Sequence, residues 1–234
     1  MLNALELTGR ADTHVSRDET LDAVLHAQTA AALISLRAAA AREGLTIYVI
    51  SGFRDFERQC SIWNSKFRGE RPLFDRKGEL LGRAALNDSE LIESILAWSA
   101  LPGASRHHWG SDCDVIDAAA LPQGYRAQLH PSEFAPGGVF SRLSAWLDSN
   151  AARFGFYRPY ATDRGGVMPE PWHLSYAPLA APALTSLTLD TLRAALSEAT
   201  ALEGRDQVLE ALPGLYERFV LNVEAPPVVP VSGG

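Results

Sequence analysis

Segments with strand character and segments with helix character follow one another irregularly along this chain, and this order restricts the fold more than any other feature. β-Branched and aromatic residues predict strands at 45–51 (LTIYVIS), 113–117 (CDVID) and 172–177 (WHLSYA). Apolar spacing and end-capping residues predict helices over 22–43, 55–67, about 88–100, from 139 onward, 187–198 and 205–220. A parallel sheet needs regular strand–helix–strand alternation, so this order predicts an α+β domain.

The length and the chain ends suggest how the domain is organised. A chain of 234 residues suits one sizeable domain, alone or with a terminal addition. We expect a main domain over residues 1–178 and a C-terminal helical extension over 179–222 packed on it. The proline- and glycine-rich end, residues 223–234, predicts a flexible tail.

Charge and composition exclude several classes of protein. The net charge of -7 argues against a nucleic-acid binder, which normally carries a basic face. No run approaches the ~18 apolar residues of a membrane span. Cys60 and Cys113 form no C-x-x-C motif, so we expect buried thiols rather than metal ligands. The first residues show no secretory signal, which indicates the cytoplasm unless export uses another route.

The segment SRHHWGSDCDV, residues 105–115, concentrates side chains that can bind a metal ion. In a strand Asp112 and Asp114 point to the same face, because side chains alternate. Gly110 permits a sharp turn that can bring a histidine back to that face. This geometry leaves two choices open, between the two aspartates and between His107 and His108.

The segment EPWH supplies a third possible ligand, His173, together with the carboxylate of Glu170. Pro171 disfavours helix at Glu170, so the segment should be extended or turned. Residues three apart on such a chain point in different directions, so the histidine can bind zinc while the carboxylate stands aside. Zinc lowers the pKa of a bound water towards about 7, and a carboxylate in that place can accept its proton.

Three segments together, SGFRDFERQ (51–59), SRHHWGSDCD (105–114) and EPWH (170–173), resemble the VanY-type zinc D-alanyl-D-alanine carboxypeptidases and dipeptidases. That family carries S-G-[YF]-R…Q, then S-x-H-x-x-G-x-x-x-D, then E-x-x-H, in this order. The resemblance covers roughly residues 50–176. It implies a small, mainly antiparallel sheet flanked by helices, with one Zn²⁺ per chain in a cleft on the sheet.

The resemblance also assigns the central residues of the site. It implies that His107, Asp114 and His173 bind the zinc ion. It implies that Glu170 is the catalytic base. Arg54 matches the arginine that holds the scissile carbonyl oxygen as negative charge develops on it.

Positions around this centre follow the family less closely. Gln59 and Ser105 match positions near the substrate. Asp112 stands where the family usually has a small residue such as alanine. We expect its carboxylate either to orient a ligand histidine or to be solvated. The role of His108 stays open between a neighbour of the site and a surface residue.

The expected function is hydrolysis of peptidoglycan stem peptides or muropeptides by a D-alanyl-D-alanine carboxypeptidase. The same site would also suit an L,D-carboxypeptidase, a D-Ala-D-Ala dipeptidase or an L-Ala-D-Glu endopeptidase. A non-enzymatic alternative is a zinc-bearing binding module, but such a module needs neither Arg54 nor Glu170. The family resemblance implies the periplasm or cell envelope as the place of action.

Overall fold

The fold is built around a four-stranded antiparallel sheet, and the computed structural model describes residues 1–226. The sheet order is β3 (Ile47–Ser51), β6 (Asp112–Asp117), β8 (His173–Tyr176) and β7 (Phe156–Tyr157). Two hairpins lie apart from it: β1 (Ser16–Asp18) with β2 (Ala23–Leu25), and β4 (Leu73–Phe74) with β5 (Leu80–Leu81). The predicted α+β fold with a small antiparallel sheet is confirmed.

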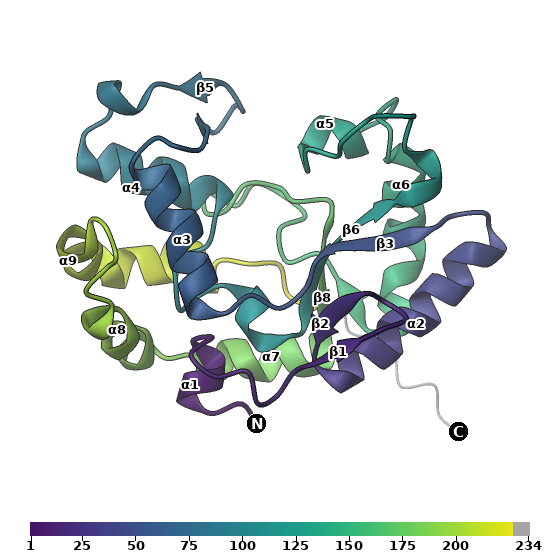
Figure 1. Ribbon diagram of the computed structural model, residues 1–234, viewed down its shortest axis with the longest axis horizontal. Coiled ribbons are helices and arrows are strands. Elements are labelled where there is room, and N and C mark those ends of the chain that lie inside the picture. Colours follow the sequence, from purple (N-terminus) through teal and green to yellow (C-terminus); the bar gives the residue numbers. More distant parts are fainter. Residues whose placement is uncertain (227–234) are drawn as a thin grey trace.

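Helices flank the sheet on two sides (Figure 1). Their buried side chains form two apolar cores. One core joins α2 and α6 to β3, β6 and β8. The other joins α3 and α4 to α7, α8 and α9. The α-helices are α1 (Ala4–Leu7), α2 (Ala27–Arg42), α3 (Phe56–Phe67), α4 (Asp88–Trp98), α5 (Pro131–Phe134), α6 (Ser141–Asn150), α7 (Ala177–Ser186), α8 (Leu189–Glu198) and α9 (Arg205–Leu215). Short 3₁₀ segments are η1 (Arg83–Ala85), η2 (Arg106–Trp109), η3 (Ala118–Ala120) and η4 (Ala151–Phe154), and η5 (Tyr216–Leu221) is π-helical.

The first long helix begins later than predicted. The prediction started at residue 22, but α2 starts at Ala27 because the preceding Ala-Val-Leu residues form β2 and pair with β1. The ring of His26 caps the helix by accepting a hydrogen bond from the N–H of Gln28. Gly44 follows the helix with a φ of +76°, in agreement with the predicted glycine end. A three-residue apolar run suits strand and helix equally, so pairing with β1 decides its conformation.

The other predicted elements agree with the structure to within a few residues. Asp55 caps α3 as expected, and of the two proposed caps for α4 it is Asn87 whose side chain accepts from the helix backbone. The helix predicted from residue 187 begins two residues later, behind the cap Thr188. The last predicted helix changes after Leu215 from α to π geometry.

The C-terminal helices α8 and α9 contribute to the core shared with α3 and α4. Leu192, Leu196 and Leu212 are fully buried there, and the indole N–H of Trp63 donates to the carbonyl of Glu203 at 3.0 Å. Residues 227–234 of the predicted tail lie outside the described residues. Both cysteines are buried and free. None of the helices within residues 1–226 has the length and apolar character needed to cross a bilayer.

Candidate active site

The pairing of β6 with β8 places an aspartate beside a histidine. In this register Asp114 lies directly opposite His173, while Asp112 lies opposite Ser175. Because side chains alternate along a strand, both aspartates belong to one face of β6. Asp114 and His173 line a cavity of about 850 Å³. The sheet register therefore brings together two groups that are 59 positions apart in the chain.

Gly110 turns the chain between His107 and β6, as the motif predicts. It has a left-handed backbone, with a φ of +65°, directly after η2. A Cβ atom here would lie 2.4 Å from Cγ1 of Val15 and 2.8 Å from the backbone nitrogen of His26. The position thus requires glycine for its φ and for the close approach of the chain. The turn places Nε2 of His107 3.4 Å from Oδ2 of Asp114.

Each of the three candidate ligands presents a donor atom to a common point. The Nδ1–H of His107 donates to the carbonyl of Gly52 at 2.8 Å, so Nε2, which lies 3.2 Å from Nη2 of Arg54, is the nitrogen that can bind an ion. The Nε2–H of His173 donates to Oδ1 of Asp112 at 2.9 Å, which leaves Nδ1. Oδ1 of Asp114 is buried and has no hydrogen-bond partner within residues 1–226. One ligand atom from each residue lies within 4.8 Å of the others. Two imidazoles and a carboxylate with an open fourth position suit a catalytic zinc ion.

The protonation of these groups follows from their surroundings. Burial raises the pKa of Asp114, but the nearby His107 and Arg54 outweigh this and hold it well below its usual range. Burial and the adjacent Arg54 lower the pKa of His107, against the opposing effect of Asp114. Burial also lowers the pKa of His173, but hydrogen bonds to two carboxylates raise it to about 9. A metal ion at Nδ1 of His173 would take the place of that proton, so binding should release it.

Glu170 stands beside the three ligands rather than among them. Its Oε2 lies 3.0 Å from Nδ1 of His173, and its side chain is 14% exposed. The backbone N–H of Glu170 donates to the carbonyl of Tyr160 at 2.9 Å, which fixes the loop that carries it. The carboxylate lines the cavity, where it can accept a proton from a water molecule at the site.

Arg54 approaches the ligands from the N-terminal end of α3. Its guanidinium donates to Oδ2 of Asp114 at 2.9 Å and to Oγ of Ser51 at 3.1 Å. Its backbone carbonyl accepts the Nδ1–H of His108 at 2.6 Å. The side chain is held on both sides and is still 23% exposed, so it can donate to a substrate oxygen.

Gln59 and Ser105 differ in how they relate to the cavity. The amide of Gln59 is fully buried, donates to the carbonyl of Ala100 at 2.8 Å and accepts from Nη1 of Arg54 at 3.4 Å. Gln59 thus supports Arg54 and is not among the residues that line the cavity. Ser105 does line the cavity, and its buried hydroxyl has no hydrogen-bond partner among the described residues.

His108 uses both ring nitrogens inside the protein. Its Nδ1–H donates to the carbonyl of Arg54, and its Nε2 accepts the N–H of Gly103 at 3.1 Å. Burial lowers its pKa to about 3, so the ring is neutral. Neither nitrogen is free for a metal ion. His108 therefore fixes the backbone of Arg54, which resolves the choice that the sequence left open.

Asp112 orients a ligand, and it does so together with a residue that the sequence did not reveal. Its Oδ1 accepts from Nε2 of His173 and from Nε of Arg106, each at 2.9 Å. Arg106 is 3% exposed and also donates to the hydroxyls of Tyr157 at 2.9 Å and Ser175 at 2.6 Å. Its only signal in the sequence was its place next to a proposed ligand, close to a carboxylate that departs from the family pattern.

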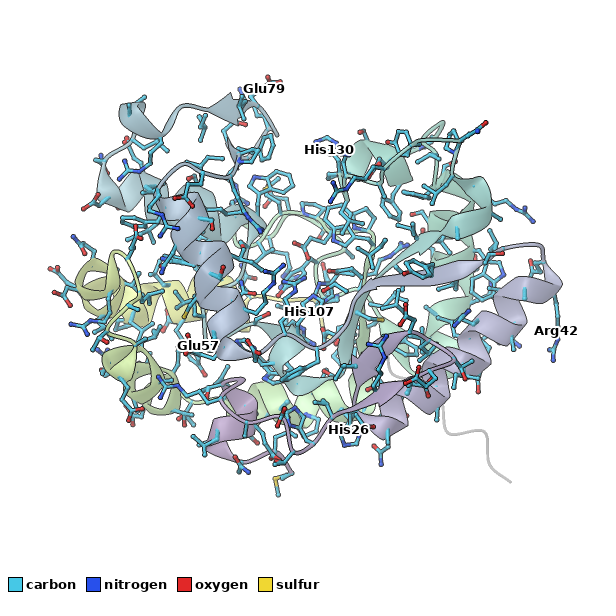
Figure 2. All side chains as sticks on the ribbon, in the orientation of Figure 1. His26, Arg42, Glu57, Glu79, His107 and His130 are labelled. Atoms are coloured by element: carbon cyan, nitrogen blue, oxygen red, sulfur yellow. The ribbon has the colours of Figure 1, made fainter. Side chains whose placement is uncertain are left out.

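The cavity that contains these groups is rich in positive charge. Figure 2 shows His107 near the middle of the molecule, below the parts that carry Glu79 and His130. Cationic side chains outnumber acidic ones around the cavity: Arg17, Arg54, Arg58, Lys66, Arg71 and Arg106 against Asp22, Asp114 and Glu170. The acidic protein therefore has a local basic cavity that favours an anionic ligand.

Comparison with known proteins decides the family. The sequence model of VanY, D-alanyl-D-alanine carboxypeptidase, matches residues 22–179. The chain belongs to the VanY family. An uncharacterized protein of Haemophilus influenzae is 35% identical over 123 residues, which cover 52% of this chain and 93% of that relative. A D-alanyl-D-alanine carboxypeptidase of Enterococcus faecalis is 29% identical over 141 residues, or 59% of this chain and 42% of that protein.

A solved structure of the VanY family supports the zinc site. It is a variant of a vancomycin-resistance D,D-pentapeptidase VanY in complex with Zn(II). The similarity covers 74% of this chain and 83% of that chain, with a TM-score of 0.50 and 26% identity. Family membership and the His-Asp-His group together identify this protein as a zinc metallopeptidase that acts on peptidoglycan peptides. The predicted family, enzyme class and cofactor are confirmed.

Proposed function

We propose that this VanY-family protein is a D,D-carboxypeptidase that removes the terminal D-alanine from peptidoglycan stem peptides. One observation carries the proposal. A carboxylate, Glu170, and a guanidinium, Arg54, flank the same group of three ligands, at 3.0 Å from His173 and 2.9 Å from Asp114. A binding module requires neither group, whereas peptide hydrolysis requires a base and an oxyanion donor.

The residues divide the work of hydrolysis between them. A zinc ion held by His107, Asp114 and His173 would polarise the scissile carbonyl and acidify a water molecule. Glu170 accepts the proton of the attacking water and can return it to the departing amine. Arg54 donates to the carbonyl oxygen as negative charge develops there. The loss of one such donor typically costs about 3 kcal/mol of transition-state stabilisation.

The basic cavity supports a peptide substrate with free carboxylates. Stem peptides that end in D-alanine carry a negative charge one residue beyond the bond to be cut. The cationic walls would attract this end and would thereby hold the scissile bond near Glu170. Hydrolysis of a neighbouring bond, as in an L,D-carboxypeptidase, a dipeptidase or an L-Ala-D-Glu endopeptidase, uses the same catalytic groups.

The test combines a base variant with an analysis of the products. Zinc-loaded wild-type protein, Glu170→Gln and the control Glu57→Gln, which changes an exposed carboxylate on α3, are incubated with defined muropeptides. We expect Glu170→Gln to retain one zinc ion per chain and to lose about 10²- to 10⁴-fold in kcat. We expect the control to match the wild type. Chelation should abolish hydrolysis, and added zinc should restore it.

Mass spectrometry of the products identifies the bond. Release of free D-alanine from a pentapeptide supports the proposal, and release of a dipeptide or cleavage of an internal bond contradicts it. Binding of the muropeptide without any hydrolysis would favour a zinc-bearing binding module. Fractionation of the native cells would show whether the enzyme meets its substrate in the envelope or meets recycled muropeptides in the cytoplasm.

A further inference from the structure

Lys66 is a cavity residue that the catalytic assignment does not use. It lies in the last turn of α3, and the residues Arg58, Ile62 and Lys66 are spaced four apart, so they share one face of this helix. All three line the cavity that contains Glu170. Lys66 is partly buried, whereas Arg58 is exposed. The C-terminal turn of this helix face therefore presents an ammonium group to the cavity.

The ammonium group of Lys66 is left with unused hydrogen-bond donors. Its Nζ donates to the carbonyl of Trp98 at 3.3 Å. No carboxylate among residues 1–226 lies within ion-pair distance of it. Burial lowers its pKa to about 8, against the opposing effect of the Glu170 carboxylate. The group thus remains largely protonated at pH 7. It carries a partly desolvated charge, and two of its three N–H donors have no partner among the residues that the structure describes.

A second unused donor lies in the same cavity. The hydroxyl of Ser105 is buried, and the structure records no hydrogen-bond partner for it. Ser105, Ala100 and Lys66 all line the cavity. A buried hydroxyl without a partner, and a partly buried ammonium that makes a single hydrogen bond, are costly unless a ligand satisfies them. A carboxylate, with two oxygens that accept hydrogen bonds, is a chemical group that each of these donors can bind.

We propose that Lys66 binds the C-terminal carboxylate of the peptide substrate, with the hydroxyl of Ser105 as a second donor. This assignment rests on the proposed function, since in a carboxypeptidase that carboxylate is one residue, about 3.5 Å of chain, beyond the scissile bond. Its counter-ion must therefore share the cavity with Glu170, as Lys66 does. Lys66 would make the enzyme an exopeptidase. An internal bond would place a neutral amide against the ammonium and would leave its charge unpaired.

Two substrates and two lysines provide the test. The chain contains two lysines, Lys66 and Lys77. Lys77 is exposed on the β4–β5 hairpin and does not line the cavity. The substrates are a stem peptide that ends in D-Ala-D-Ala and its C-terminal amide. Hydrolysis of both is measured for zinc-loaded wild-type protein, Lys66→Met, Lys66→Arg and the control Lys77→Met.

We expect the wild type and Lys77→Met to prefer the free acid. Lys66→Met should lose about 10- to 100-fold in kcat/KM on the acid, mainly through KM, and little on the amide. Lys66→Arg should keep most of the preference, since it keeps the charge. An acid-to-amide ratio that Lys66→Met leaves unchanged would overturn the assignment. If the wild type hydrolyses neither peptide, the proposed function fails, and this outcome is distinct from a failure of Lys66 alone.

A binding experiment keeps the assignment testable without catalysis or a change at Lys66. The zinc-loaded Glu170→Gln protein is acetylated at pH 8 with and without the peptide, and the modification of both lysines is quantified by mass spectrometry. We expect the free acid to protect Lys66 and the amide to protect it less, with Lys77 equally reactive throughout. Equal modification of Lys66 in the presence and absence of saturating free acid would refute the contact.

Discussion

Replacement of Asp112 by alanine should weaken both the fold and the zinc site, for two separable reasons. The carboxylate is fully buried and accepts from Arg106 on one side and from His173 on the other. The Asp112→Ala variant leaves the guanidinium of Arg106, which is 3% exposed, without its counter-ion. Loss of one partner of a buried ion pair costs about 3–5 kcal/mol. For a chain of this length that corresponds to a fall in Tm of about 10 °C.

The second effect is on metal affinity. The hydrogen bond from Nε2 of His173 to Asp112 fixes the ring so that Nδ1 faces the other ligands. Loss of such a partner typically lowers metal affinity about 10- to 100-fold. The double variant Arg106→Leu/Asp112→Ala separates the two effects. It removes the unpaired charge, so it should recover part of the lost stability while its zinc affinity stays low.

The two quantities are measured independently. Urea unfolding of the zinc-free proteins gives the free energy of unfolding, and competition with a chelating dye gives the zinc affinity. The reasoning would be refuted if Asp112→Ala changed the free energy of unfolding by less than about 1 kcal/mol. It would also be refuted if the double variant were less stable than the single one. An unchanged zinc affinity would contradict the orienting role of Asp112.

Two further predictions concern the turn and the buried histidine. Gly110→Ala should lower the free energy of unfolding by about 2–5 kcal/mol, because it adds left-handed backbone strain and places a Cβ against Val15. It should also weaken zinc binding. Thermal unfolding that matches the wild type would contradict this prediction. The folded-state pKa of His108, about 3, lies below its ordinary value near 6.5, so its contribution to stability is present above pH 6.5 and is lost as the pH falls towards 3. Over this range the free energy of unfolding of the wild type should therefore fall more steeply than that of His108→Gln, by up to about 1.4 kcal/mol per pH unit; parallel curves would show that His108 does not titrate this way.

Local patterns were sufficient to predict most elements of the fold. The strand at 47–51 and the helix that begins after Asp55 carry their own signals, namely β-branched residues and a capping carboxylate. The start of α2 was predicted wrongly, because Ala23–Leu25 reads as the first turn of an alanine-rich helix. Only the presence of β1 as a pairing partner makes these three residues a strand.

The site shows the same division. Spacing around Gly110 indicated that a histidine and an aspartate could meet. The choice of His107 over His108, and of Asp114 over Asp112, as metal ligands needed the family resemblance. The structure gives the physical reasons for that choice. Both nitrogens of His108 are occupied by backbone groups. Both carboxylate oxygens of Asp112 accept hydrogen bonds, whereas Oδ1 of Asp114 has no partner among residues 1–226. Arg106 has no motif of its own, because its role depends on a carboxylate that the β6–β8 register turns towards it.

The sequence by itself determined the chemistry available to this protein: two imidazoles, carboxylates, a guanidinium and the glycine that lets the chain reverse between them. These are properties of single residues and of short spacings, so they can be read without a fold. Tertiary structure alone decided which of these atoms lie together at the candidate metal site and which are engaged in hydrogen bonds with other groups. It placed Lys66 in the last turn of α3 beside the same cavity, where its Nζ makes one hydrogen bond within residues 1–226. The distances between groups from distant segments depend on sheet register and helix packing, and no local pattern in the chain encodes them.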